Sequence, residues 1–510
     1  MKRIKRVRDR IILHPIMSFI VLIFGTIALS GVLNLFNIST RYNRITPSGG
    51  YESVLVSVES LFNLGGLKYI FSNTVSNFAA FTPLSMLIIV LIGFGIMDKS
   101  GFLDSFFYIL TKKVSKKVVT FSLSLICIIA SIVGDLSFVV LIPLAALLFK
   151  YGKRHPKAGI ICAFASLSCG IGINIFMNSV DSTLLGYTSI SANILTSGYI
   201  ISNYANILIM FVAAISLALI ITNITEKTVV PMLGHYKFEN DDEDYLTKRE
   251  KRGLIISLFC GLAYIILFVY NIIPNVPLGG NLLDNSQILY IDKLFGYNSF
   301  FNQGFVFVVT FLFIIVGLSY GIVNQSIRNH RDVCSHLSHS LDGVGKVLVL
   351  IFMSSMFIFI FKKTNIGPVI VAVLANLINS VGFTGIPLIL LVLLVSAIST
   401  LLVPGSANKW AILSGVVVPV FMNAGMSPEF AAIVFRGGEC ITYALTPVMA
   451  YFIIYVAFME LYSQDESDTL IGNIKYMLPY AGYTALIWII ILVAFYIIGA
   501  PLGINAFPTL

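Results

Sequence analysis

The sequence predicts an all-α polytopic membrane protein with nine transmembrane helices plus two re-entrant hairpins, arranged as inverted repeats with two broken helices. Three observations predict this fold class. The 510 residues are 57% hydrophobic and 11% charged, with a mean hydropathy of +0.92, whereas soluble domains are about 45–50% apolar and about 25% charged. Apolar runs of about 20 residues, enough to span a bilayer, recur along the chain. Two regions share one internal layout.

The repeated layout covers residues 131–186 and 399–455. Each region passes from an apolar run through a small or polar interruption into a second apolar run, starts a helix at an X-Pro pair, and is then interrupted again. The first interruptions are Gly134-Asp135 and Pro404–Asn408. The X-Pro pairs are His155-Pro156 and Ser427-Pro428. The second interruptions are Gly170–Asp181 and Gly437–Pro447. We interpret each region as a hairpin followed by a broken helix.

The first half is expected to hold four spans and one hairpin. The basic segment before Ile11 places residue 1 in the cytoplasm, because cytoplasmic loops are enriched in Lys and Arg. The spans are expected at about 14–36, 69–97, 157–185 (broken) and 203–225, and the hairpin at 118–149. A hairpin keeps the basic loops on both sides of 118–149 inside, and such a turn is tolerated only where it is buried in protein or lines an aqueous cavity.

The second half repeats this plan after a charged cytoplasmic linker at residues 237–252. Its elements are spans at about 253–273, 301–323, 346–361, 428–458 (broken) and 479–499, and a hairpin at 385–422 that enters from outside. Lys362-Lys363 then falls outside, against the usual charge bias. The expected units are 1–110 (scaffold), 111–200 (first transport unit), 201–382 (linker and scaffold), 383–460 (second transport unit) and 461–510 (last span).

The two transport units face opposite ways in this topology. Inverted repeats with discontinuous helices near the midplane are typical of secondary transporters. Exchanging the conformations of two inverted halves converts an inward-open state into an outward-open one. The pattern therefore favours a transporter over a channel or an intramembrane enzyme.

Five charged residues lie in otherwise apolar surroundings: Asp135, Asp181, Lys409, Arg436 and Glu439. Each would cost about 2.5–3.5 kcal/mol at the centre of a membrane helix. They are therefore expected to face a polar cavity or one another.

Asp181 is a candidate cation ligand or proton acceptor, together with Asn174 and Asn178 at the same helix break. The alternative is a simple helix cap. Asp135 has the same two interpretations, an ion-coupling residue or a turn residue at a hairpin tip.

Arg436 and Glu439 are spaced i, i+3 and would simply pair, or Arg436 would receive a substrate carboxylate bidentately. Trp410 would stack on an aromatic substrate or anchor the protein at the membrane interface.

Other chemistry has little support. The six cysteines lack a C-x-x-C spacing, and no nucleotide-binding motif, Ser-His-Asp set or H-E-x-x-H motif is found. The charge of +9 lies mostly in short loops, with no basic patch that would bind nucleic acid. We expect neither enzymatic activity nor transport powered by ATP.

Long segments of the chain resemble the AbgT family of bacterial transporters, associated with p-aminobenzoyl-glutamate uptake and, in some members, sulfonamide antimetabolite efflux. They are GDLSFVVLIPLAALLFKYGKRHPKAGIICAFASLSCGIGINIFMNSVDSTLLG, SANKWAILSGVVVPVFMNAGMSPEFAAIVFRGGECITYALTPVMAYF, SNFAAFTPLSMLIIVLIGFGIMDKSG and RVRDRIILHP. The resemblance covers essentially the whole chain.

The resemblance implies a homodimer in the bacterial inner membrane, with each protomer coupled to sodium or protons. It places Asp181 at the aspartate of the first broken helix, and Trp410, Pro428, Arg436 and Pro447 at functional positions of the second repeat. Glu439 stands where family members have Asp, and Asn408 departs from the expected tip.

These indications give one mechanistic hypothesis. Asp181, Asn174 and Asn178, and the second tip with Ser406 and Asn408, would hold the cations. Arg436 and Trp410 would hold the glutamate and ring ends of p-aminobenzoyl-glutamate or a related aromatic carboxylate. Asn408 and Glu439 complete the expected substrate site and Asp135 the ion-coupling set. No cofactor is expected apart from bound sodium, and the alternative function is proton-driven efflux of sulfonamide-like antimetabolites.

Overall fold

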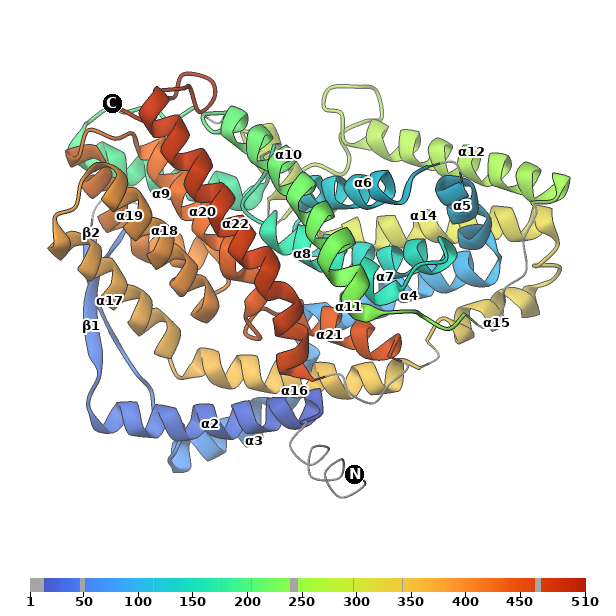
Figure 1. Cartoon of the computed structure of the whole chain (residues 1–510), viewed down its shortest axis with the longest axis horizontal. Helices are drawn as coiled ribbons and strands as arrows, with labels where there is room; N and C mark the ends of the chain where they lie inside the picture. The colour runs from blue at the N-terminus through green and yellow to red at the C-terminus, as the bar shows by residue number, and fades with distance from the viewer. Residues whose placement is uncertain are drawn as a thin grey trace.

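The computed structural model describes residues 13–45, 51–112, 114–175, 177–202, 204–238, 246–296, 298–341, 343–463 and 469–510. The basic segment at residues 1–12, the loop residues Pro47 and Gly49-Gly50, and most of the acidic part of the 237–252 linker lie outside these ranges. Long apolar helices dominate the described part of the chain (Figure 1).

Nine helical stretches in the described ranges are long and apolar enough to cross a membrane, as many as the sequence predicts, but the two sets differ. They are Pro15–Leu35, Leu64–Lys99, Lys116–Val133, Ile207–Leu233, Lys248–Asn271, Phe300–Asn324, Val344–Lys363, Gly385–Leu402 and Leu470–Ile498. The first arm of each hairpin belongs to this set. The predicted broken helices do not, because each consists of two short helices.

The N-terminal part contains a β-hairpin that the sequence analysis did not predict. Helix α2 (Pro15–Leu35) is followed by strands β1 (Ser39–Ile45) and β2 (Tyr51–Ser57), which pair antiparallel with Tyr42 opposite Val54. Val54, Leu55 and Val56 form a short apolar run in β2 and include the β-branched residues that favour strands. The connection between the expected spans at 14–36 and 69–97 is therefore partly a two-stranded sheet.

The predicted span at 69–97 is two helices, α3 (Leu64–Ala79) and α4 (Thr82–Lys99). The chain leaves the helix at Ala80-Phe81, and Pro83 lies in the first turn of α4. Proline has no backbone N–H and favours the first turn of a new helix, which accounts for the interruption. A further helix, α5 (Phe102–Lys112), follows.

The first repeat has the predicted order of elements. The hairpin consists of α6 (Lys116–Ile129) with the 3₁₀ turn η1 (Ala130–Val133), then α7 (Leu136–Tyr151). Gly134 joins the two arms with φ +65°, a conformation that favours glycine. The broken helix consists of α8 (Pro156–Cys169) and α9 (Ser179–Leu195), and α10 (Ile207–Ile224) follows.

The second repeat follows the same plan, but its break starts later than expected. Its hairpin is α18 (Gly385–Leu402) and α19 (Ser406–Asn423), and its broken helix is α20 (Pro428–Thr442), the 3₁₀ turn η3 (Tyr443–Leu445) and α21 (Phe452–Leu461). Gly437 and Gly438 lie inside α20, which corrects the predicted start of the break. A Cβ atom at Gly438 would lie 2.4 Å from Ser396 Cβ, so this glycine permits α18 and α20 to pack closely.

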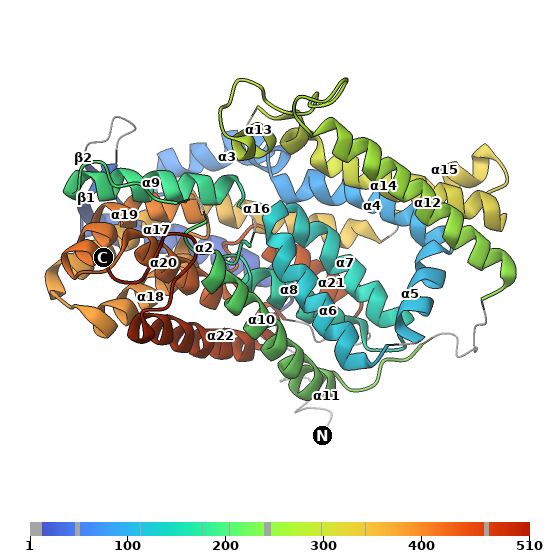
Figure 2. The same ribbon diagram turned by 90° about the horizontal axis from the view of Figure 1, so that it is seen from above.

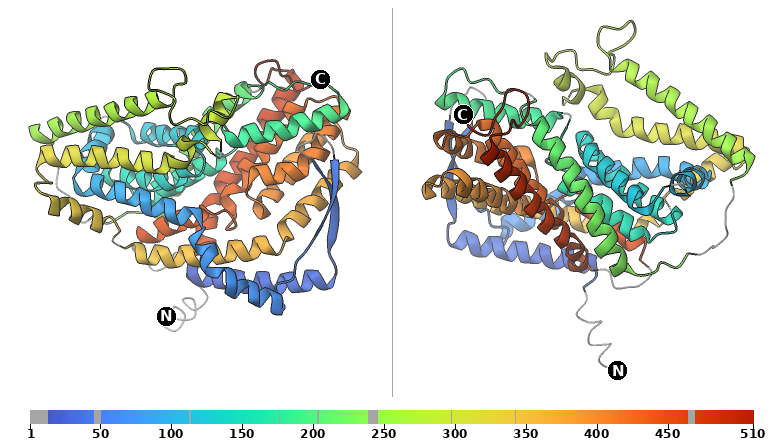
Figure 3. Two further views of the ribbon diagram at one scale, coloured as in Figure 1. Left: turned by 180° about the vertical axis from the view of Figure 1, so that it is seen from behind. Right: turned by 45° about the horizontal axis from the view of Figure 1, so that its top comes forward.

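The remaining helices form two scaffold layers on opposite faces of the repeats (Figures 1 and 3). Helix α4 packs against α14 beside α12 in one layer, and α2 packs against α16 in the other. The scaffold and final helices are α12 (Lys248–Asn271), α13 (Tyr290–Phe295), α14 (Phe300–Asn324), α15 (His330–His339), α16 (Val344–Lys363), α17 (Ile366–Val381) and α22 (Leu470–Ile498). Helix α17 was not predicted. Each layer therefore combines helices from both halves of the chain.

The two hairpins lie toward opposite ends of the molecule. Helices α6 and α7 are at the right and α18 and α19 at the left in two perpendicular views (Figures 1 and 2). This placement is the one expected of inverted repeats. Lys363, which the charge bias did not explain, forms an ion pair with Glu59 at 2.6 Å.

The last residues form a strap between the two repeats. The carbonyl of Leu502 accepts hydrogen bonds from the backbone of Leu208 and Ile209, at the start of α10. The backbone N–H of Ser427, just before α20, donates to the carbonyl of Pro508 at 3.0 Å. The strap therefore connects the N-terminal ends of α10 and α20.

Candidate functional site

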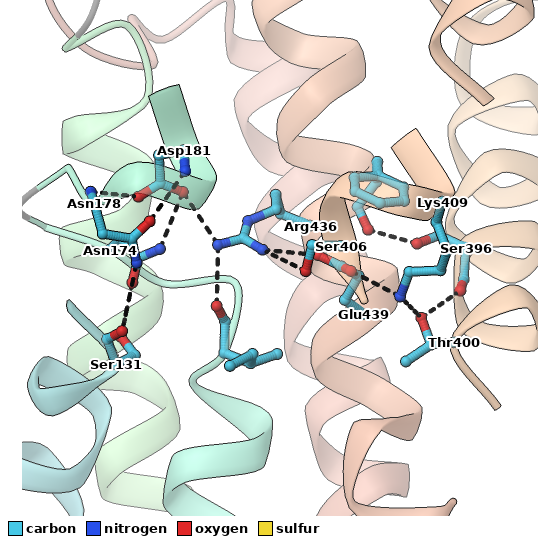
Figure 4. A network of polar contacts seen from close by, with 12 residues as sticks. Ser131, Asn174, Asn178, Asp181, Ser396, Thr400, Ser406, Lys409, Arg436 and Glu439 are labelled. Carbon is cyan, nitrogen blue, oxygen red and sulfur yellow. Dashed lines mark hydrogen bonds and ion pairs between the residues drawn. The ribbon is translucent and has the colours of Figure 1, made fainter. Parts of the chain in front are cut away.

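Four charged side chains form one buried network between the repeats (Figure 4). Arg436 Nη2 lies 3.1 Å from Asp181 Oδ1, and Arg436 Nη1 lies 2.8 Å from Glu439 Oε2. Lys409 Nζ lies 2.7 Å from the other oxygen of Glu439. The order Asp181, Arg436, Glu439, Lys409 alternates in sign, so each inner charge has an opposite charge on either side.

The first broken helix positions Asp181. Asn178 and Asp181 form a capping box at the start of α9, in which each side chain accepts a hydrogen bond from the other residue's backbone. The amide of Asn174 donates to Asp181 Oδ1 at 3.0 Å. The hydroxyl of Ser131, at the tip of the first hairpin, donates to Asn174 Oδ1 at 2.8 Å. Asp181 is thus a helix cap and a member of the charged network at once.

The second hairpin positions the other end of the network. Lys409 is fully buried, and its ammonium donates to the hydroxyl of Thr400 at 2.7 Å. Thr400 lies on α18, Lys409 on α19 and Glu439 on α20, so this cluster ties both hairpin arms to the broken helix. Arg436 Nη1 also donates to the hydroxyl of Ser406 in the first turn of α19, at 3.1 Å.

Arg436 also reaches the backbone of the first break. Its Nη2 donates to the carbonyl of Ile171 at 3.0 Å. The adjacent Gly172 makes this approach possible, because a Cβ there would lie 2.7 Å from the carbonyl of Arg436. One guanidinium therefore joins the first break, α9 and the tip of the second hairpin, a use of its fixed fork of donors.

Two positive and two negative charges make the network neutral when all four groups are ionised. Asp181, Lys409, Arg436 and Glu439 are each at most 8% exposed. Removing one partner from a buried ion pair typically costs about 3–5 kcal/mol, because the other charge is left uncompensated. A change in the charge of any member therefore disturbs the whole set.

Two of the predicted substrate residues, Arg436 and Glu439, belong to the network, and Ser406, a predicted ion-coupling residue, is hydrogen-bonded to it. Trp410 lies outside it, fully buried: its indole N–H donates to Thr188 at 2.9 Å, and its ring lies 4.6 Å from that of Phe435.

The remaining candidates lie at other places. Asn408 is exposed at the second tip, Pro428 is in the first turn of α20, and Pro447 lies in the second break. Asp135 lies at the first hairpin tip and interacts with the hydroxyl of Tyr451 in the second break. Four of the five predicted charges therefore meet one another, and Asp135 is separate.

Two spaces adjoin the first turn of α9. A cavity of about 50 Å³ lies on the side of Asp181 and Arg436, between α9, α20 and the start of α10. A groove of about 420 Å³ lies on the other side, lined by Ser182, Asp292 and Ala407 among others. The volume of the groove is within the range of small-molecule sites.

Ser131, Thr400 and Thr188 support the site and were not predicted from the sequence. Small hydroxyl residues are frequent in membrane helices, where most bond to their own backbone. Thr400 lies nine residues before Lys409 on the opposite arm of the hairpin, and this antiparallel arrangement is the one signal that would have paired them.

The whole chain, residues 1–510, matches the family described as "AbgT putative transporter family". The protein belongs to the AbgT family. Over 500 residues it is 26% identical to the p-aminobenzoyl-glutamate transport protein of Escherichia coli strain K12, which covers 98% of this chain and 94% of that relative. The predicted family is therefore confirmed.

Two solved structures are also similar to this AbgT protein. The Alcanivorax borkumensis YdaH transporter has 26% sequence identity and a TM-score of 0.49, covering 96% of this chain and 100% of that one. Neisseria gonorrhoeae MtrF has 31% identity and a TM-score of 0.49, covering 97% of each chain. The family match confirms a transporter, not an enzyme, and a multi-pass protein of the bacterial inner membrane.

Proposed function

We propose that this AbgT protein is an ion-coupled secondary transporter of p-aminobenzoyl-glutamate or a related aromatic carboxylate, working as a homodimer. The observation that carries the proposal is the buried Asp181–Arg436–Glu439–Lys409 network, which joins the first broken helix to the second hairpin and second broken helix. The name of the Escherichia coli relative supports the substrate.

Charge balance supports coupling between a cation and a carboxylate. When Asp181 is ionised, the network is neutral and Arg436 is paired with Asp181. When a cation neutralises Asp181, the remaining three charges sum to +1, and Arg436 is available to a carboxylate. A substrate carboxylate can then take the place of Asp181 on the guanidinium, in the bidentate geometry that Arg favours.

The position of the network supports alternating access. Its members and their hydrogen-bond partners come from the first break, α9, both arms of the second hairpin and α20. Replacing the ion pairs by contacts with the substrate would therefore change the interactions between these elements. The first turn of α9 lies between the small cavity and the substrate-sized groove. A shift of this turn would connect the groove with Arg436.

The membrane potential gives a reason for coupling in the direction of uptake. Benzoyl-glutamate carries two carboxylates, and moving each negative charge inward costs about 2.3 kcal/mol per 100 mV. Two co-transported cations cancel this cost. Asp181 with Asn174 and Asn178 is the proposed site of one, and the second tip with Ser406 and Asn408 of the other.

Trp410 is proposed to contact the aromatic ring of the substrate once its own contacts change. In the described conformation, its indole is enclosed by Thr188 and Phe435. Movement of α9, which carries Thr188, would uncover the face of this ring.

The test is transport of labelled p-aminobenzoyl-glutamate by the purified protein in liposomes under imposed sodium or proton gradients. We expect accumulation against the substrate gradient with at least one of the two ions. Equal rates with and without both gradients would contradict the proposal, and single-channel currents in a planar bilayer would indicate a channel instead.

A second candidate is proton-driven efflux of sulfonamide-like antimetabolites. MtrF, 31% identical to this chain, is described as illuminating a class of antimetabolite efflux pumps. The same liposomes distinguish the two functions when a labelled sulfonamide is loaded inside. Efflux driven by an inward proton gradient, without uptake of p-aminobenzoyl-glutamate, would favour the second candidate.

A further inference from the structure

Another buried charged residue, Glu429, lies on the face of α20 that carries Arg436. Glu429 precedes Arg436 by seven residues, or two helical turns, which places it about 10 Å further along the helix. Its side chain is 2% exposed. The hydroxyl of Tyr199 donates to its carboxylate at 2.9 Å. Glu429 takes no part in the four-residue network, and Tyr199, its side-chain partner in the described part of the chain, is neutral.

The cavity of about 50 Å³ adjoins the network and the face of α20 that carries Glu429. Ala432, one turn after Glu429, lines the cavity together with Arg436 and Asp181. A buried water needs about 10–15 Å³ of such space, so the cavity has room for about three. Tyr204, which is 49% exposed, forms part of the wall, so the cavity lies close to the protein surface.

Two polar atoms indicate that this cavity is hydrated. Arg436 Nε and Asn206 Oδ1 are buried and have no hydrogen-bond partner among the described residues. Both residues line the cavity, and one atom is a donor and the other an acceptor. Buried polar groups of this kind are normally satisfied by ordered water.

We infer that Glu429, the hydrated cavity and Asp181 form a proton path from the N-terminal end of α20 to the charged network. A proton from external water binds the Glu429 carboxylate. It passes through the cavity water to Asp181, and Glu429 returns to its anionic form. This inference deepens the proposed function, on which it rests, by making the proton a coupling ion and assigning its entrance.

The contacts of Asp181 define where the proton arrives. Oδ1 accepts from Asn174 and Arg436, whereas Oδ2 accepts from the backbone N–H of Asn178 at 3.2 Å. The less occupied Oδ2 is the proton acceptor. The neutral carboxyl then releases Arg436, which becomes available to the substrate.

Titratable groups of several elements contact residues of α20. They are Tyr199 before α10, Asp181 on α9, Lys409 on α19 and Tyr496 on α22, whose ring stacks on Phe430. Among the described residues, Tyr199 is the one hydrogen-bonded to Glu429. A pH dependence that disappears with Glu429→Gln, but is kept by Tyr199→Phe, therefore belongs to the carboxylate.

The test uses full-length protein in liposomes that contain a pH-sensitive dye. External p-aminobenzoyl-glutamate should acidify the lumen in step with substrate uptake in the wild type. Glu429→Gln should slow substrate-linked acidification at least tenfold and leave substrate binding to the solubilised protein unchanged. Glu460→Gln is the matched control, because this carboxylate pairs with His14 at the other end of the second broken helix.

A second variant tests the cavity without changing a carboxylate. Ala432→Leu should fill the space and cause the same proton defect, whereas Ala432→Ser should keep transport within twofold of the wild type. Thermal unfolding of the solubilised variants identifies any that fail to fold. Glu429→Gln keeps an acceptor for the hydroxyl of Tyr199.

The outcomes separate this inference from the function on which it rests. Wild-type protein that transports without any ion gradient overturns the proposed function. Wild-type protein coupled to sodium alone, or Glu429→Gln protein that moves protons at the wild-type rate, overturns the proton path and leaves substrate transport standing.

Discussion

Arg436 holds together more of the site than any other single side chain described. Its two terminal nitrogens donate to Ser406, Glu439, Asp181 and the carbonyl of Ile171. These partners come from the second hairpin, its own helix, α9 and the first break. A lysine could place a charge at this point but could not reproduce the fork, so the geometry of the guanidinium matters as much as its charge.

At the same scale, Asp181→Asn is expected to uncouple transport. The substitution fixes the network at a net charge of +1, whatever the pH or sodium concentration. Binding of p-aminobenzoyl-glutamate should persist and lose its dependence on pH or sodium, while gradient-driven uptake should fall at least tenfold. Calorimetry of the solubilised protein and liposome uptake measure the two effects.

Asp284→Asn is the control for this substitution. Asp284 is a carboxylate in the loop before α13, where hydrogen bonds from Ser286 lower its pKa, so it stays ionised at neutral pH. It lines neither of the two spaces beside α9. Asp181→Asn protein whose uptake still follows the gradients would exclude the role assigned to this carboxylate.

Lys409 is expected to contribute mainly to stability. Lys409→Met leaves Glu439 with Arg436 as its remaining ionic partner in the described structure, and loss of a buried partner costs about 3–5 kcal/mol. The melting temperature in detergent should fall. The double variant Lys409→Met/Glu439→Gln should recover part of the loss, and a double variant less stable than the single one would show that the two residues do not act as a pair.

At the scale of elements, glycines set the distance between α20 and its neighbours. Gly438 brings α20 against Ser396 and the carbonyl of Leu393 on α18, and Gly437 brings it against Trp488 on α22. The sequence analysis took these two residues for the start of the break. A pair of glycines is compatible with a helix break and with the close approach of two helices. The tertiary packing distinguishes these two cases, and the sequence does not.

Gly438→Ala should therefore separate α18 from α20. The added methyl would lie 2.4 Å from Ser396 Cβ and 2.6 Å from the Leu393 carbonyl. Overpacking of this kind costs about 1–3 kcal/mol. Gly482→Ala in α22, where nothing lies within 4 Å of the new methyl, should be neutral or stabilising by up to about 1 kcal/mol. Thermal unfolding of the two variants, measured side by side, tests this difference in stability.

Much of the arrangement of elements was predictable from the sequence, for physical reasons. Gly134-Asp135 and the prolines at 156 and 428 mark turns and helix starts by their backbone preferences. The buried charges had to meet because lipid cannot solvate them. Arg436 with Glu439 follows from their spacing, but the pairing of Lys409 with Glu439, and of Trp410 with Thr188, depends on how separate helices pack. The β1–β2 hairpin was missed because β1 is largely polar and the apolar residues of β2 do not alternate with polar ones.

At the scale of the whole molecule, the halves of the chain are interlocked. Each scaffold layer contains helices of both halves, and the C-terminal strap joins the start of α10 to the start of α20. The two repeats are therefore linked at these helix ends, as well as through Arg436 near the middle. Independent movement of one repeat requires the hairpins to move relative to these fixed connections.

Gly503→Val should weaken the connection made by the strap. A Cβ at residue 503 would lie 2.3 Å from the carbonyl of Tyr204 and 2.5 Å from that of Ala205, so a side chain pushes the strap away from the start of α10. We expect a lower melting temperature and slower transport. Gly186→Ala, at an open position of α9, is the control. Unchanged melting and transport would mean that the strap is not a structural link.

The capping box at the start of α9 links Asp181, the carboxylate proposed to bind the coupling ion, to the stability of the first helical turn. Asp181 stabilises the first turn through its negative charge and the Asn178 backbone, and a neutral carboxyl does so less well. Each transport cycle should therefore fray and re-form this turn. In hydrogen–deuterium exchange, the amides of residues 179–182 would then lose protection as the coupling ion binds, which makes a single turn of helix a reporter of the cycle.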